Sequence, residues 1–156
     1  MCWVRKRRVG CRFGQRGQAL VEFALMLPLL LIVVFITVDF GVGLTRWIAV
    51  TNAAREGARL GAVGGEVGEI KLKAIDTSDG ILSDGDIEVG FFDADGSGGI
   101  DPGDSVVVDV HYDYDLITPL GRFLSVTFDS LTLSACSDMR LELFAGQSAS
   151  GPQGCD

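Results

Sequence analysis

The stretch that decides the fold joins a basic leader to a long apolar run, and it reads Arg16-Gly17-Gln18-Ala19-Leu20-Val21-Glu22-Phe23-Ala24-Leu25-Met26-Leu27-Pro28-Leu29-Leu30-Leu31. The run continues to Val38, and its only polar members are Glu22 and Thr37. Twenty helical residues measure about 30 Å, which is the thickness of the hydrocarbon core of a bilayer. The run therefore predicts a transmembrane helix.

The charges on either side of this run predict its orientation. Residues 1–17 hold six of the thirteen basic residues and none of the 21 acidic residues of the chain. Basic residues before a membrane span favour a cytoplasmic N-terminus, so the rest of the chain is expected outside the cell membrane as a single-pass protein. The body of the chain is strongly acidic and would repel phosphate, which argues against nucleic acid as a partner.

Small residues extend the helical pattern beyond the membrane run. They recur every four residues at Gly41, Thr45, Ala49, Ala53, Gly57 and Gly61, with Ala54, Ala58 and Ala62 beside them. A face of small residues lets another helix approach closely. One helix is therefore expected over residues 18–63, after a leader at 1–17. Two alternatives remain: a cleaved secretory signal, with Gly41-Val42-Gly43 as a weak cut site, and an alanine-rich helix that is merely solvated.

The remainder predicts a small exported α+β domain over residues 64–145. Gly64-Gly65 breaks the helix, and the apolar spacing in residues 66–75 predicts a second, short helix. Alternating apolar residues predict strands at 87–91, at 106–114 and at 127–144. In the middle strand, Val106, Val108, Val110, Tyr112 and Tyr114 share one face. The fold class is thus α+β, a long N-terminal helix followed by a small antiparallel sheet, with a flexible tail at 146–156.

The cysteines favour a disulfide over a metal site. Cys136 and Cys155 lie in the part expected outside the cell, where a bridge is stable. Closing a loop of that size stabilises by roughly 3 kcal/mol in the chain-entropy view. Two unpaired thiols are the alternative. With no Cys-x-x-Cys spacing and a single histidine, His111, a zinc site is not expected.

No group of residues in the sequence predicts catalysis. There is no Ser-His-Asp arrangement, no phosphate loop and no cysteine placed beside His111. We therefore expect no catalytic residues and no enzymatic activity.

Residues 93–104 have the length and layout of an EF-hand calcium loop. Oxygen donors fall at its ligand positions in Asp93, Asp95, Ser97, Gly99 (through its carbonyl), Asp101 and Asp104, and Gly98 occupies the sharp turn. The last position holds Asp in place of the usual Glu, and the flanks are predicted strands, not helices. The alternatives are a weak calcium site and an Asp/Gly-rich hairpin loop without a metal.

Glu22 is unusual because a carboxylate near the bilayer core costs about 2.5–3.5 kcal/mol on insertion scales. In one interpretation it lies near the cytoplasmic interface and is stabilised by the helix N-terminal dipole. In the other it pairs with a positive charge inside an assembly. A cut after Gly17 would create such a charge, the α-amine of Gln18.

The segment Gly17-Gln18-Ala19-Leu20-Val21-Glu22-Phe23-Ala24-Leu25, followed by Leu27-Pro28, resembles the N-terminus of the TadE-like pseudopilins of the tight-adherence (Flp) pilus system. Residues 52–59, Asn-Ala-Ala-Arg-Glu-Gly-Ala-Arg, and residues 134–142 are similar to later segments of that family. The resemblance implies processing by a prepilin peptidase after Gly17, with Glu22 as the fifth mature residue. It also implies contact with other pilin subunits through the 18–63 helix.

Two functions follow as expectations. The first is a membrane-anchored minor pilin or pseudopilin in the assembly of a tight-adherence type IV pilus or a related secretion apparatus. The second is an uncleaved single-pass membrane protein whose exported β-domain binds calcium or another ligand.

Overall fold

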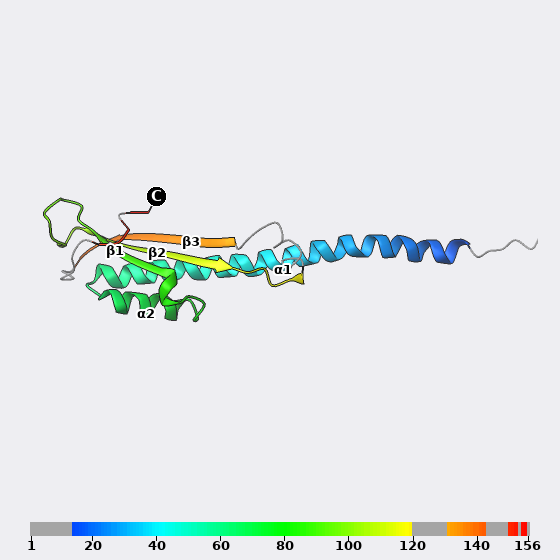
Figure 1. Ribbon diagram of the computed structural model, residues 1–156, viewed down its shortest axis with the longest axis horizontal. Helices are drawn as coiled ribbons and strands as arrows, with labels where there is room; N and C mark the ends of the chain where they lie inside the picture. The colour runs from blue at the N-terminus through cyan, green and yellow to red at the C-terminus, as the bar shows by residue number, and fades with distance from the viewer. Residues whose placement is uncertain (1–13, 120–130, 143–149, 153, 156) are drawn as a thin grey trace, which may run out of the picture.

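The computed structural model describes residues 14–119, 131–142, 150–152 and 154–155. Two helices come first, α1 at Gly14–Ala62 and α2 at Val67–Thr77. A 3-10 turn, η1 at Asp84–Asp86, leads into the strands β1 at Ile87–Phe92, β2 at Ser105–Tyr114 and β3 at Leu131–Arg140. Both helices lie on one face of the sheet, and α1 continues far beyond it (Figure 1). The predicted α+β fold class is confirmed.

The sheet is antiparallel, with the order β1-β2-β3 in the described chain. Val108 pairs with Val89 on one side and with Ser137 on the other. Successive side chains of a strand point to opposite faces, and Val106, Val108 and Val110, which share the face toward the helices, are fully buried. The alternation predicted for the middle strand is therefore confirmed.

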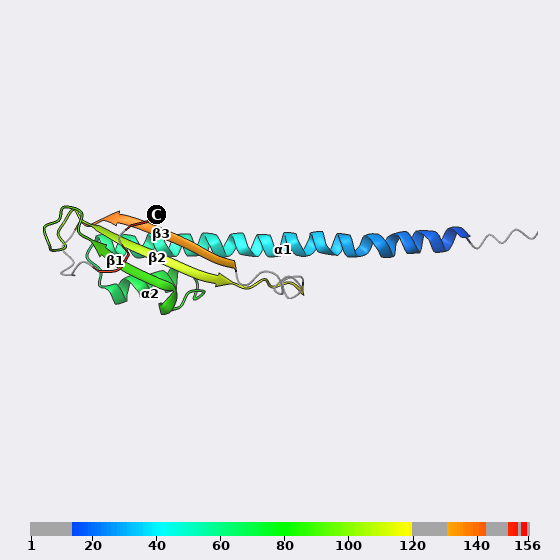
Figure 2. The ribbon, with the colours of Figure 1, turned by 45° about the horizontal axis from the view of Figure 1, so that its top comes forward.

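The small residues of α1 bring the sheet and α2 close to its backbone. Ala53, Ala54 and Ala58 are at most 1% exposed. A Cβ placed on Gly61 would lie 2.8 Å from Val106 Cγ2, so only glycine fits there without movement. The small-residue face is thus a close-packing surface, as predicted. The sheet and α2 of the same chain pack against this face, and α2 lies beside α1 in both views (Figure 2).

The second helix forms where the sequence predicts it, with ends shifted by one or two residues. Glu66 and Glu69 form a capping box at its start, which satisfies backbone N–H groups of the first turn. Ile70 and Ala74, four residues apart, are fully buried in the core shared with α1 and the sheet.

The C-terminal tail, predicted to be flexible over residues 146–156, makes backbone contacts with β1 at residues 150–152. Ser150 exchanges two backbone hydrogen bonds with Phe91 of β1, at 2.8 and 3.2 Å. The backbone of Pro152 lies so close to Gly90 that a Cβ there would be 2.6 Å from the Pro152 oxygen. Two glycines, Gly90 and Gly151, make this approach possible because neither has a side chain. Residues 146–149 lie outside the described residues.

Two predicted boundaries also change. The long helix begins at Gly14, four residues before the predicted start, so the end of the predicted leader is helical. Residues 1–13 lie outside the described chain. The last predicted strand, 127–144, is a strand over Leu131–Arg140, while 127–130 and 143–144 are not among the described residues.

Candidate functional site

The first candidate is the half of α1 that extends beyond the domain. Leu20, Leu25, Leu30 and Phe40 are between 59% and 72% exposed. The helix contains a window with a mean hydropathy of 2.8 and no buried residue, which is long and apolar enough to cross a membrane. A solvated helix would not expose so continuous an apolar surface, so this half requires lipid or protein around it.

Gly17, Gln18 and Glu22 lie in the first three turns of α1, and all three are exposed. Gln18 and Glu22 are four residues apart, so they lie on the same face about 6 Å apart along the axis. None of the ion pairs of the described chain involves Glu22. The structure therefore leaves this carboxylate available to a positive group from outside the domain.

The fold does not require glycine at position 17. A Cβ built there meets no atom within 4 Å, so a larger side chain would fit the isolated chain. Glycine in a helix is also less favourable than alanine by about 1 kcal/mol. The fold therefore gives no reason for glycine at this position.

Asp39, at the end of the apolar run, is the residue that sequence reasoning missed. It is only 6% exposed. Its Oδ1 accepts hydrogen bonds from the backbone N–H groups of Ile117 and Thr118, at 3.2 and 3.1 Å, and its Oδ2 accepts one from Thr118 Oγ1. The signal in the sequence was an acid directly after the predicted transmembrane run, which ends at Val38. Nothing in the local sequence indicated its hydrogen-bond partners, which lie almost 80 residues away.

A groove of about 390 Å³ opens beside Asp39, between α1 and the membrane-proximal end of the sheet. Its walls are almost wholly apolar, with Ile36, Phe40, Leu44 and Trp47 from α1 and Tyr114 and Leu133 from the strands. The Tyr114 hydroxyl donates to the Asp39 carbonyl at 3.4 Å. Burial, and next the Asp39 charge, raise the pKa of Tyr114, so this side chain stays neutral at physiological pH.

The predicted calcium loop lies between β1 and β2, at the end of the sheet remote from the exposed half of α1 (Figure 1). Carboxylate oxygens of Asp93, Asp95 and Asp104 lie within 4.8 Å of one another. The structure does not bring Asp101 into this group. Its carboxylate instead accepts a hydrogen bond from Ser97 Oγ at 3.4 Å, and that hydroxyl also lies 3.4 Å from the Gly99 carbonyl.

The same carboxylates accept hydrogen bonds from the loop's own backbone. Asp93 accepts from Gly96 and Gly98, each at 2.7 Å, and the buried Asp104 accepts from Ala94 and Asp101. The N–H of Gly98 above all holds the pKa of the Asp93 carboxyl below its ordinary value, against an opposing effect of burial. The loop's geometry therefore has a complete account without a metal, and calcium binding stays a prediction.

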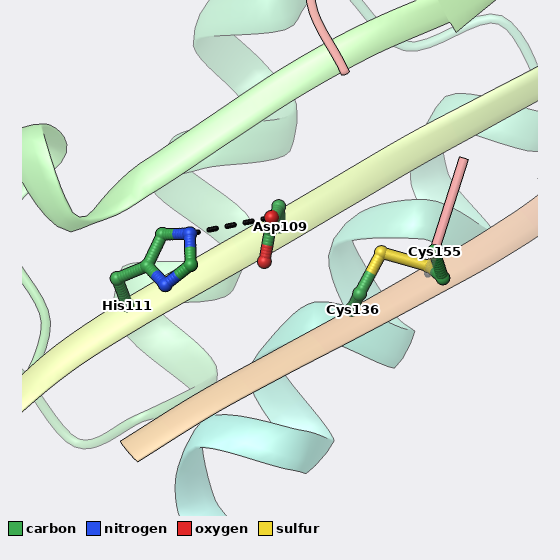
Figure 3. Close-up of a disulfide and its surroundings, with 4 residues drawn as sticks. All are labelled: Asp109, His111, Cys136 and Cys155. Atoms are coloured by element: carbon green, nitrogen blue, oxygen red, sulfur yellow. Dashed lines mark ion pairs between the residues drawn. A yellow bond between two sulfur atoms is a disulfide. The ribbon is translucent and has the colours of Figure 1, made fainter. Parts of the chain in front are cut away.

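Cys136 and Cys155 form a disulfide on the outer face of the sheet, with 5.6 Å between their Cα atoms (Figure 3). The bridge holds the C-terminus against β3, beside Asp109, which is the register partner of Cys136. The half-exposed His111 points along the same face, with its Nε2 3.2 Å from Asp109 Oδ2. This pair resembles an ordinary surface ion pair more than a catalytic dyad.

The comparison with known families finds one match. A family described as TadE-like protein matches residues 17–59, which cover most of α1 and stop before the sheet. The chain is therefore similar to TadE-like proteins over this helix, and the resemblance stated from the sequence is confirmed there. No curated protein and no solved structure matches the chain.

The calcium prediction can be tested by thermal unfolding. If the loop binds calcium, millimolar calcium raises the melting temperature of the detergent-solubilised protein, because a ligand that binds only the folded state stabilises it. Magnesium should act more weakly, and Asp93→Asn with Asp95→Asn should abolish the shift. Asp115→Asn, an exposed acid elsewhere, is the matched control. An unchanged melting temperature would establish the loop as a hairpin connection without a metal.

The Asp39 contacts predict a stability effect. Asp39→Ala leaves the N–H groups of Ile117 and Thr118 without their acceptor, which should lower the free energy of unfolding by about 1–3 kcal/mol. Chemical denaturation followed by near-ultraviolet circular dichroism measures it. Asp115→Ala, on the same segment but exposed, should change little. Equal effects of both substitutions would show that Asp39 does not hold the segment.

Proposed function

We propose that this protein is a membrane-anchored minor pilin or pseudopilin that acts in the assembly of a tight-adherence type IV pilus or a related secretion apparatus. The observation that carries the proposal is that the TadE-like match and the helix α1 have nearly the same boundaries. The TadE-like match begins at Gly17, within the first described turn of α1, and ends at Arg59, in its last turn. The part of the chain that resembles the family is thus α1, both where it extends beyond the domain and where it packs against the sheet.

The division of α1 supports a role in assembly. From Val50 to Ala62 its small residues are buried by the sheet and by α2, so they are not available to a neighbour. From Gln18 to Ile48 most side chains are exposed and apolar. Other subunits would therefore contact the first half of the helix, while the second half holds the exported domain at a defined place on it.

The position of Glu22 gives this assembly a specific contact. Cleavage after Gly17 would leave the α-amine of Gln18 one helical turn before the Glu22 carboxylate. An ionised carboxylate among apolar helices costs several kcal/mol unless an opposite charge compensates it. In an assembly, the amine of the same or a neighbouring subunit would supply that charge.

The proposed role requires no catalysis by this chain. The side chains of His111 and Asp109 lie together on an exposed face, and on the neighbouring strand Cys136 has no free thiol because it is bonded to Cys155. The leader would be removed by a separate prepilin peptidase, acting in the membrane. The N-terminus would lie in the cytoplasm and the sheet outside, as the basic leader predicts.

The second candidate function is an uncleaved membrane protein with a calcium-binding exported domain. It is favoured by one observation, the three carboxylates of Asp93, Asp95 and Asp104 within 4.8 Å of one another. The two candidates differ in the fate of the leader, so the processing experiment separates them.

Replacing Gly17 tests the processing step. In cells that carry a prepilin peptidase, Gly17→Leu should leave the leader attached, because a bulky side chain at the cut site obstructs recognition. Mass spectrometry of the membrane-extracted protein measures this as a mature mass larger by the leader. Gly41→Leu, at another helical glycine with no atom near its Cβ, should be processed normally. A leader that stays attached in the wild type as well, so that its mass differs from that of Gly17→Leu only by the Gly-to-Leu side chain, would refute cleavage at this site.

Replacing Glu22 tests the assembly contact. Glu22→Ala and Glu22→Gln should insert into the membrane normally, since both remove an insertion cost. Both should reduce the recovery of pili sheared from cells, because the compensating pair is lost. Membrane flotation measures insertion, and Glu88→Gln, an exposed acid on β1, is the control. Normal piliation of both Glu22 variants would contradict the pairing.

A further inference from the structure

The distance between two carboxylates limits how α1 can sit in a bilayer, given the membrane anchoring proposed above. Sixteen residues separate Glu22 from Asp39. As a helix they measure about 24 Å, which is less than the roughly 30 Å of the hydrocarbon core. One of the two acids must therefore lie at the depth of the core or be shielded from lipid.

The contacts of the two acids decide which one lies at that depth. Glu22 is exposed, whereas Asp39 is covered and accepts hydrogen bonds from Ile117 and Thr118. A hydrogen-bonded carboxylate inside protein costs far less at membrane depth than one facing lipid. Because the protein shields Asp39 in this way, the next unshielded charge along α1 after Glu22 is Arg46. The lipid-compatible stretch becomes residues 23–45, about 34 Å long.

The segment that shields Asp39 must then lie at the same depth. Its side chains suit this place, since Leu116 is 39% and Ile117 63% exposed although both are large and apolar. Leu131, at the start of β3, is 58% exposed and also lines the groove beside Asp39. The tip of the exported domain thus presents large apolar side chains where it meets the membrane-spanning half of α1, with the exposed carboxylate of Asp115 beside them.

We propose that outer-leaflet lipid fills the groove beside Asp39, so that the tip of the exported domain is immersed in the membrane surface. The apolar wall of the groove is continuous along α1 with the membrane-spanning run, from Ile36 through Phe40 and Leu44 to Trp47. A core that begins after Glu22 and spans about 30 Å ends near Val42. Trp47 is five residues further, about 7 Å outside the core, in the interfacial layer where tryptophan is enriched.

Trp47 also provides the probe. The chain has two tryptophans, Trp3 in the leader and Trp47 in the groove, so Trp3→Phe leaves Trp47 alone. The full chain with Trp3→Phe is reconstituted in vesicles of zwitterionic lipid at low protein density. Brominated lipids then quench tryptophans that contact acyl chains. Quenching of Trp47 should be stronger with bromine near the glycerol end of the chain than with bromine near its methyl end.

Two further variants calibrate the depth that the quenching of Trp47 reports. Both variants lack Trp3 and Trp47, so that the introduced tryptophan is the only one in the chain. Leu30→Trp lies in the middle of the exposed run and should be quenched most by bromine near the methyl end. Phe92→Trp lies at the last residue of β1, next to the loop at 93–104 and remote from the exposed half of α1, and should not be quenched at all.

The outcomes separate this inference from the anchoring on which it rests. Quenching of Leu30→Trp without quenching of Trp47 would leave the anchor intact and overturn the immersion of the domain tip. Loss of both signals would overturn the membrane anchor itself. Quenching of Trp47 that is weak at high protein density and rises on dilution with lipid would identify a second copy as the occupant of the groove, and would overturn lipid.

Discussion

The whole domain depends on the second half of α1, where the buried face over residues 53–62 carries nothing larger than a methyl group. Ala54, Gly57, Ala58 and Gly61 allow β2 to lie almost on the helix backbone, and Val106 occupies the place that a Cβ on Gly61 would need. This close contact buries the inner face of the sheet and one side of α2 in a single core. A three-stranded sheet is marginally stable alone, so the helix acts as the second layer of the domain.

The two halves of α1 differ in their surroundings: the second half is packed in the domain, and the first half is exposed. Beyond the sheet, toward the N-terminus, no described residue covers it except the segment around Ile117 and Thr118. Its apolar side chains therefore face whatever the membrane or an assembly provides. The match to TadE-like proteins covers both parts of the helix, and the sheet lies outside the match. The similarity to these proteins is thus confined to α1, and the sheet packs against the second half of that helix.

Asp39 connects the two parts. An acid at this point of an apolar helix would normally mark where the membrane ends, because an exposed charge is costly in hydrocarbon. Here the partners of the carboxylate come from the segment after β2, so the charge is shielded and the boundary can lie further along the helix. The disulfide between Cys136 and Cys155 holds the C-terminus against the face of the sheet that points away from the helices.

The sequence by itself determined the elements whose signals are local. The apolar run predicts the long helix, the four-residue spacing of Gly57 and Gly61 predicts its packing face, and the alternation of Val106, Val108 and Val110 predicts the middle strand. Only the tertiary structure decided the rest. The partners of Asp39 lie 78 and 79 residues away, and Ser150 meets β1 through backbone atoms that carry no sequence signal. Such contacts depend on how separate elements meet in space, and a periodic pattern reports only the face that one element buries.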